Sequence, residues 1–171
     1  MIIHTDRLIL RHFNLDDAQE YFPLVSDPRV LKYTGEAPFT SLDQVRQMLL
    51  ARPINDYSQF GFGRMACIEK MSGRLIGFSG MKFLSDLQEV DIGYRFIKDC
   101  WGKGYATESA SAIMRQAVPE HQLKKVIGLT FPDNAASIHV LTKLGLQFEK
   151  KIKIDDLENE LNYYSISYNY A

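Results

Sequence analysis

The sequence has 171 residues, 46% of them apolar, which suits a sizeable core, and we expect residues 1–171 to form a single domain. Twenty basic against twenty-one acidic residues give a net charge of -1, which excludes a global attraction to nucleic acid or to an anionic membrane. No apolar run of about eighteen residues occurs, and Cys67 and Cys100 form no metal-type pair, so we expect a cytoplasmic protein that holds no metal.

The first third of the chain predicts one strand followed by helices. Asn14 is a good N-cap for the first helix, which Pro23 should shorten or bend. Ser41 and Gln44 form a capping box for the last helix of this region. The expected elements are a strand over 7–11, a helix over 15–25, a short helix from 27–28 and a helix over 42–51.

The remaining residues predict a sheet that alternates with helices after the third strand. The first three strands are close in sequence and should form an antiparallel meander. The expected elements are strands over 61–69, 74–83 and 89–96, a helix over 105–118, a strand over 126–130, a helix over 135–144, and strands over 147–154 and 162–168. This order predicts the α+β class, with a mixed, mostly antiparallel central sheet and helices on both faces.

A glycine-containing turn leads directly into the helix at 105. Gly102 and Gly104 allow backbone conformations that a side chain would block, and the helix start offers unpaired N–H groups and a positive dipole end. Such a turn can hold a pyrophosphate. The spacing fits neither a dinucleotide fingerprint, because Thr107 stands where a third small residue is needed, nor a P-loop, because Gly104 follows Lys103.

Two carboxylates fall on one face of the strand over 89–96. Alternation directs Glu89, Asp91 and Gly93 to one side and the intervening apolar residues to the other. From the residues alone, carboxylates on a strand are more often solvated surface groups than catalytic ones.

Motifs along nearly the whole chain, in the same order and spacing, resemble a known family. They lie at 5–11 (Thr-Asp-Arg-Leu-Ile-Leu-Arg), 26–30, 38–41, 77–80 (Gly-Phe-Ser-Gly), 92–94 (Ile-Gly-Tyr), 101–108 (Trp-Gly-Lys-Gly-Tyr-Ala-Thr-Glu), 134–137 and 143–146. Together they resemble the GNAT superfamily of N-acetyltransferases, and within it the branch of ribosomal-protein N-terminal acetyltransferases.

The resemblance implies the GNAT acyl-CoA N-acyltransferase fold and acetyl-CoA as cosubstrate, with no metal. The pantetheine arm would lie in a V-shaped opening between the strand that ends at Phe96 and the strand over 126–130, and the turn after 101 would take the pyrophosphate. The implied cofactor-binding residues are Tyr94, Arg95, Phe96, Gly102, Lys103, Gly104, Tyr105, Ala106, Thr107 and Asn134.

The catalytic residues implied by the resemblance depart from the superfamily pattern. The frequent general-acid tyrosine falls at Leu141, which cannot donate a proton, and the matching branch places a serine at Ser137 instead. We therefore assign assistance to the leaving thiol to Ser137; its alternative role is to cap or pack its helix. The family's base lies on the strand over 89–96, as Glu89 or Asp91, and we prefer Asp91 because it is nearer the expected thioester.

The acceptor is a primary amine. An α-amine titrates near ~8 and a lysine side chain near ~10.4, so an N-terminal acceptor loses its proton more readily. The branch implies a protein N-terminus, such as that of a ribosomal protein, with no direct contact with nucleic acid or membrane, and the family also contains homodimers.

Two other functions remain open from the sequence. One is acetylation of a small amine such as a polyamine or an aminoglycoside. Acidic residues near the expected acceptor segments would suit any cation: Glu36, Asp155, Asp156, Glu158 and Glu160. The other is a catalytically weak CoA-binding sensor module, which the leucine at 141 would favour.

Overall fold

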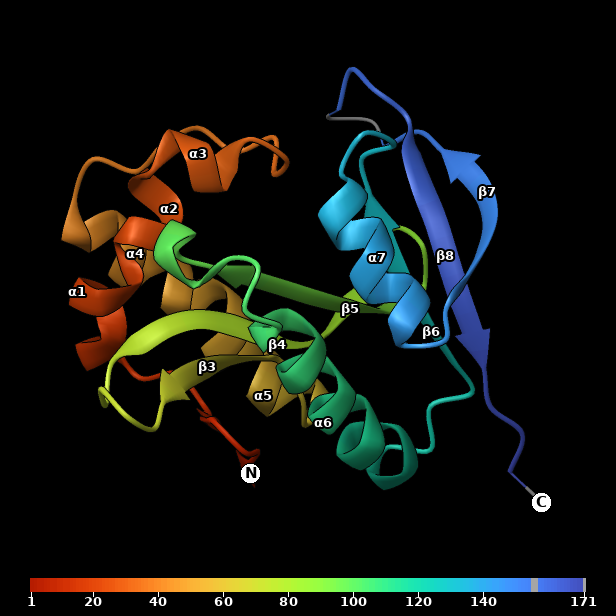
Figure 1. The fold of residues 1–171 in the computed structure, drawn as a ribbon, viewed down its shortest axis with the longest axis horizontal. Coiled ribbons are helices and arrows are strands. Elements are labelled where there is room, and N and C mark those ends of the chain that lie inside the picture. The colour runs from red at the N-terminus through yellow and green to blue at the C-terminus, as the bar shows by residue number, and fades with distance from the viewer. Residues whose placement is uncertain (155–156, 171) are drawn as a thin grey trace.

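A computed structural model describes residues 1–154 and 157–170 of the chain. At its centre is an eight-stranded sheet in the order β1-β2-β3-β4-β5-β6-β8-β7 (Figure 1). The strands are β1 (Ile2–His4), β2 (Leu8–Arg11), β3 (Arg64–Glu69), β4 (Leu75–Leu84), β5 (Glu89–Phe96), β6 (Lys125–Thr130), β7 (Gln147–Ile152) and β8 (Leu161–Ser167). Neighbouring strands are antiparallel except β5 and β6, which are parallel. The predicted mixed sheet and its meander, β3 to β5, are confirmed; β1 was not predicted.

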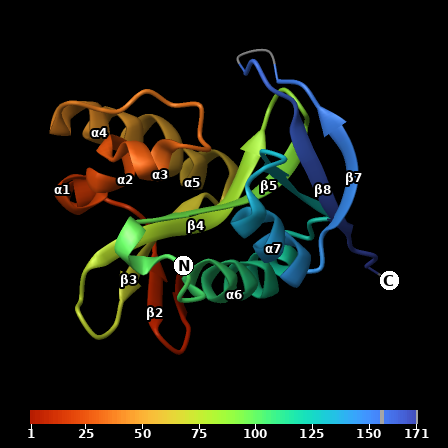
Figure 2. The ribbon, with the colours of Figure 1, turned by 45° about the horizontal axis from the view of Figure 1, so that its top comes forward.

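Short helical segments from the N-terminal third cover one face of this sheet (Figure 2). They are η1 (Leu15–Asp17), α1 (Ala18–Tyr21), α2 (Pro23–Ser26), α3 (Pro28–Leu31), α4 (Leu42–Leu49) and α5 (Asn55–Phe60). The single helix predicted over 15–25 is divided, because Pro23 lacks an N–H donor and begins a new segment. Both predicted caps form: the Asn14 side chain accepts from the N–H of Asp16, and Ser41 and Gln44 make a capping box.

The helix that begins at α4 continues further than the sequence indicated. A π-helical turn, η2 (Leu50–Ile54), joins α4 to α5, and Pro53 lies inside it. A π turn does not need the regular i to i-4 hydrogen bond that proline cannot donate, so the chain passes Pro53 without leaving the helix. The helix ends at Gly61, which has a φ of 77°.

Two longer helices cover the opposite face. They are α6 (Tyr105–Glu120) and α7 (Ala135–Lys143), within one or two residues of the predicted ends. Alternation along the strands divides the core between the faces: Met65, Ile92 and Phe96 pack toward α6, whereas Ala66 and Phe78 pack under the N-terminal helices.

The parallel strands β5 and β6 meet at Asp91 and Ile127 and share no further register pair among the described residues. Beyond Asp91 the strands therefore separate, as the V-shaped opening requires. Each continues to pair on its other side, β5 with β4 as far as Phe96 and β6 with β8 as far as Thr130. In the described part of the chain, no helix has the length and apolar character to cross a membrane.

Candidate active site

The turn before α6 presents unpaired backbone to solvent. Gly102 and Gly104 have φ angles of 72° and 82°, a region that favours glycine. A Cβ at Gly102 would meet nothing within 4 Å, and one at Gly104 only the Arg7 guanidinium, at 3.5 Å. No side chain caps α6 at Gly104, so the first N–H groups of the helix stay available to a ligand.

Arg7 places a positive charge beside this turn, a contact that the sequence did not reveal. Its Nη1 donates to the Lys103 carbonyl at 2.8 Å, and its guanidinium lies 4.3 Å from the Tyr105 ring centre. Glu108 holds it through Nε at 2.7 Å and Nη2 at 2.6 Å. The turn therefore combines free N–H groups and a helix dipole, which suit a diphosphate, with an arginine whose charge Glu108 balances.

Tyr94 and Phe96 point from β5 toward α6 and α7, whereas Arg95 points to the other face. The indole N–H of Trp101 donates to the Phe96 carbonyl at 2.8 Å, which fixes the end of β5 against the turn. Arg95 donates to the Leu24 carbonyl at 3.2 Å and pairs with Glu36 at 2.8 Å, so its side chain holds the N-terminal helices to the sheet.

Helix α7 places Ser137 beside the opening. Asn134 is the N-cap of the helix, as its sequence position suggested, and its side chain accepts from the N–H of Ser137 at 3.2 Å. The Tyr94 hydroxyl, which comes from β5, donates to the Ser137 carbonyl at 3.1 Å. Leu141, one turn further, is 1% exposed and packs against Gly128 of β6, so it belongs to the core.

The two carboxylates predicted on β5 have different surroundings. Glu89 lies at the closed end of the parallel pair, where it accepts from the Tyr163 hydroxyl at 3.0 Å and pairs with Lys125 at 3.2 Å. Asp91 lies where the strands separate, is 7% exposed and forms an ion pair with Arg64. Burial raises the pKa of Asp91, and the Arg64 charge opposes that rise. A carboxylate with a raised pKa is the better proton acceptor.

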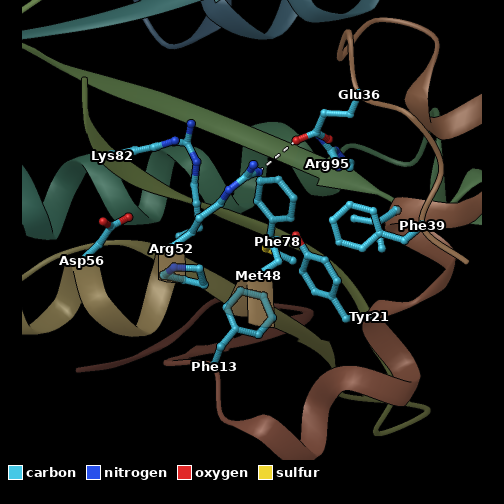
Figure 3. Close-up of a pocket in the computed structure, with 13 residues that line it drawn as sticks. Phe13, Tyr21, Glu36, Phe39, Met48, Arg52, Asp56, Phe78, Lys82 and Arg95 are labelled. Carbon is cyan, nitrogen blue, oxygen red and sulfur yellow. Dashed lines mark hydrogen bonds and ion pairs between the residues drawn. The ribbon is translucent and has the colours of Figure 1, made fainter. Parts of the chain in front are cut away.

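A pocket of about 160 Å³ lies on the face that carries Asp91, between the N-terminal helices and strands β3 to β5 (Figure 3). Tyr21, Phe39 and Phe78 gather on one side of it, and Lys82 and Asp56 lie on the other. Its charged lining residues are Glu36, Arg52, Asp56, Arg64, Lys82 and Arg95. The α6 turn is on the opposite face of the sheet from this pocket.

Comparison with known proteins identifies the family. A sequence model described as the acetyltransferase (GNAT) domain matches residues 7–147. The chain belongs to the GNAT acetyltransferase family. It is 33% identical over 149 residues to an uncharacterized N-acetyltransferase, p20, from Bacillus licheniformis, a match over 86% of this chain and 83% of p20.

Solved GNAT structures agree with the fold. An acetyltransferase of this family from Bacillus anthracis superposes with a TM-score of 0.82 at 26% identity, over 98% of both chains. An acetyltransferase from Salmonella typhimurium that modifies the N-terminal serine of the 50S ribosomal subunit protein L7/L12 has a TM-score of 0.79 at 17% identity. That match covers 99% of this chain and 100% of the Salmonella chain. Structural neighbours of this GNAT chain thus include ribosomal-protein acetyltransferases, as the resemblance implied.

Among the described residues of the acidic set that would suit a cationic acceptor, Glu36 alone lines this pocket. Arg95 at 2.8 Å and Arg52 at 3.1 Å take up its carboxylate. It is therefore not free to attract a cationic acceptor. Asp155 and Asp156 lie outside the described residues, and Glu158 and Glu160 are exposed outside the pocket.

The sequence also missed three basic residues of this pocket. Arg52 belongs to the π-helical turn, Arg64 to the start of β3 and Lys82 to β4. The local sequence around each of them gives no sign of a site, since single basic residues in or near predicted helices and strands are ordinarily solvated. The signal that points to Lys82 is its cross-strand register with Asp91, which appears only once the strands are paired.

Proposed function

We propose that this protein transfers the acetyl group of acetyl-CoA to the α-amino group at the N-terminus of a protein or peptide. One observation carries this proposal. The strands β5 and β6 separate beyond Asp91, between the uncapped turn and Ser137 on one face and the Asp91 pocket on the other. An amine and a thioester could thus approach each other from opposite sides of the sheet.

The residues of the turn fit the diphosphate of acetyl-CoA. Gly102 and Gly104 leave the backbone open, the first turn of α6 supplies N–H donors, and Arg7, held by Glu108, adds guanidinium N–H groups beside the turn. When bound, acetyl-CoA would supply an acetyl carbon that is open to attack by an amine. The chain's own residues would then only position that carbon and move protons.

Asp91 accepts the proton that the amine gives up as its nitrogen bonds to the acetyl carbon. Arg64 holds the carboxylate in place and opposes the rise in its pKa that burial causes. An α-amine with a pKa near ~8 is partly neutral already at physiological pH, so a weak base suffices.

Ser137 stabilises the sulfur as the carbon–sulfur bond breaks. Its hydroxyl donates a hydrogen bond to the departing thiolate, which is a stable leaving group because thiol pKa values lie near ~8.5. Full protonation of the sulfur is not needed at this stage, so a serine one helical turn before Leu141 can take the role that the superfamily often gives to a tyrosine.

The N-terminal acceptor has two supports. The Salmonella neighbour acts on the N-terminal serine of a ribosomal protein, and the α-amine is the more easily deprotonated class of amine. The test is an acetylation assay with N-terminal peptides, peptides whose only free amine is a lysine side chain, and spermidine. We expect the N-terminal peptides to have the highest kcat/KM, with the acetyl group on the α-nitrogen by mass spectrometry.

The same assay separates the other functions. A higher kcat/KM for spermidine or an aminoglycoside would replace the peptide acceptor with a small amine and leave the acetyltransferase assignment intact. Binding of acetyl-CoA without release of free thiol in the presence of any amine would indicate the sensor module and overturn the proposed reaction.

A further inference from the structure

The pocket beside Asp91 contains more positive than negative charge. Four cationic side chains line it, Arg52, Arg64, Lys82 and Arg95, against the carboxylates of Glu36 and Asp56. Arg52 and Arg95 share Glu36, and Arg64 pairs with Asp91, which lies behind the lining. An acceptor that carries a further positive charge, besides the amine that is acetylated, would therefore be repelled by the net charge of the pocket.

Lys82 is the member of this group that no carboxylate of the described residues contacts directly, although the charges of Asp56 and Asp91 act on it from a greater distance. Its ammonium has no ion pair within 4.0 Å and no hydrogen bond to any residue of the described ranges, whereas each of the three arginines has a carboxylate partner. Burial, followed by the charges of Arg64 and Arg52, lowers its pKa. A bound anion would remove that electrostatic cost.

The register of the sheet fixes where such an anion would lie. Lys82 and Asp91 are direct partners in the β4–β5 ladder, so their side chains leave the same face about 5 Å apart. An amine that reaches Asp91 would therefore carry the anion within a few bonds of its nitrogen. The aromatic side of the pocket, with Tyr21 and Phe78, would contact the apolar part of the same molecule.

We propose that the acceptor carries a carboxylate close to the amine that is acetylated, and that Lys82, assisted by Arg52, binds this carboxylate. This inference rests on the proposed acetyl transfer and defines its substrate class: an N-terminus whose first or second residue is acidic. The same chemistry occurs in a free amino acid, whose own carboxylate lies beside its amine, and the test must separate these two sources.

The experiment measures kcat/KM at saturating acetyl-CoA for peptides that differ only at the second residue, glutamate, glutamine or lysine. Free glutamate and spermidine complete the series. We expect the glutamate peptide to exceed the isosteric glutamine peptide by about 10- to 100-fold, the range of one charge-assisted hydrogen bond in a partly buried site. The lysine peptide and spermidine should be the poorest acceptors. If free glutamate surpasses the glutamate peptide, the carboxylate subsite stands but its source is a free amino acid.

A Lys82→Met variant tests the assignment to one residue. It should reduce the ratio of the glutamate to the glutamine peptide toward one, and thermal unfolding will show whether the fold is kept. Lys151→Met, at an exposed position of β7, is the matched control and should keep the wild-type ratio. If Lys82→Met itself fails to fold, Lys82→Gln provides the same comparison.

The outcomes distinguish the two proposals. Equal rates with the glutamate and glutamine peptides, a preference for spermidine, or an unchanged ratio in a folded Lys82 variant would overturn the carboxylate subsite while acetyl transfer itself remains. Failure to acetylate any amine, in a protein that still binds acetyl-CoA, would instead overturn the proposed function.

Discussion

The Tyr94 hydroxyl lies 3.1 Å from the Oγ of Ser137, so strand β5 and helix α7 place two hydroxyl groups side by side. The Tyr94 hydroxyl also lies within hydrogen-bond distance of the Ser137 carbonyl, at 3.1 Å, and either hydroxyl can be the donor in the contact between them. Burial raises the pKa of Tyr94, so its hydroxyl stays protonated at neutral pH. A sulfur at this place could receive a hydrogen bond from either group.

This pair determines how the leaving group is assisted. We expect Ser137→Ala to lower kcat by up to about 10²-fold, with a smaller change in acetyl-CoA affinity, because a positioned donor acts mainly on the transition state. In the double variant Ser137→Ala, Tyr94→Phe, the fold-loss of kcat should be larger than the product of the losses in the two single variants, because each hydroxyl can replace the other in part. Thr142→Ala, which removes an exposed hydroxyl from the same helix, is the control and should leave kcat unchanged. Full turnover of Ser137→Ala at every pH would show that the serine is structural.

The glycine turn should control cofactor affinity. Gly104→Val imposes a β-branched side chain on a φ of 82°, which costs about 1–2 kcal/mol or displaces the backbone N–H groups. We expect KM for acetyl-CoA to rise about tenfold or more. Gly73→Val is the matched control, because Gly73 has a φ of 69° in the turn between β3 and β4 and an added Cβ there would meet no atom within 4 Å. If both variants raise KM equally, the effect is general strain and the turn is not the diphosphate site.

The two carboxylates of β5 should differ sharply in their effect on rate. We expect Asp91→Asn to reduce kcat/KM by about 10²- to 10⁴-fold, as loss of a general base does, while Glu89→Gln has a small effect. The rising limb of the wild-type pH profile should lie above the ordinary carboxyl range, because burial raises the pKa of Asp91. In Asp91→Asn that limb should disappear. A larger loss with Glu89→Gln would reverse the assignment of the base.

Glu36 should make stability depend on pH. Burial opposes its ionisation, but Arg95 and Arg52 outweigh that and lower its pKa below 4.5. A carboxyl whose pKa is lower in the folded state contributes stability above its unfolded pKa, and this contribution is lost as the pH falls through the folded pKa. We expect Glu36→Gln to lower the free energy of unfolding in urea at about pH 7 and to differ less from the wild type at about pH 3. A constant difference across this range would contradict a role for the ionised pair.

The sequence by itself determined the strands from β2 to β8, both long helices and the glycine turn, because their signals are local. Caps such as Asn14 and Ser41, alternation along β5 and glycine at 102 and 104 act over a few residues and need no distant partner. Alternation along β5 also directed Glu89 and Asp91 to one face of the sheet and their apolar neighbours to the other. The path of the chain through Pro53 was missed, because a π turn is decided by what packs around it rather than by propensity.

Only the tertiary structure decided the chemistry of the two sides of the opening. Arg7 reaches the turn across about a hundred residues of sequence, Arg64 meets Asp91 across 27, and Tyr94 meets Ser137 across 43. The charge of the pocket between the N-terminal helices and the sheet follows from the same kind of pairing: Glu36, which is an acidic residue in the sequence, is paired with Arg95 across 59 residues. An ion pair depends on distance in space and on burial, and neither can be read from one segment of the chain.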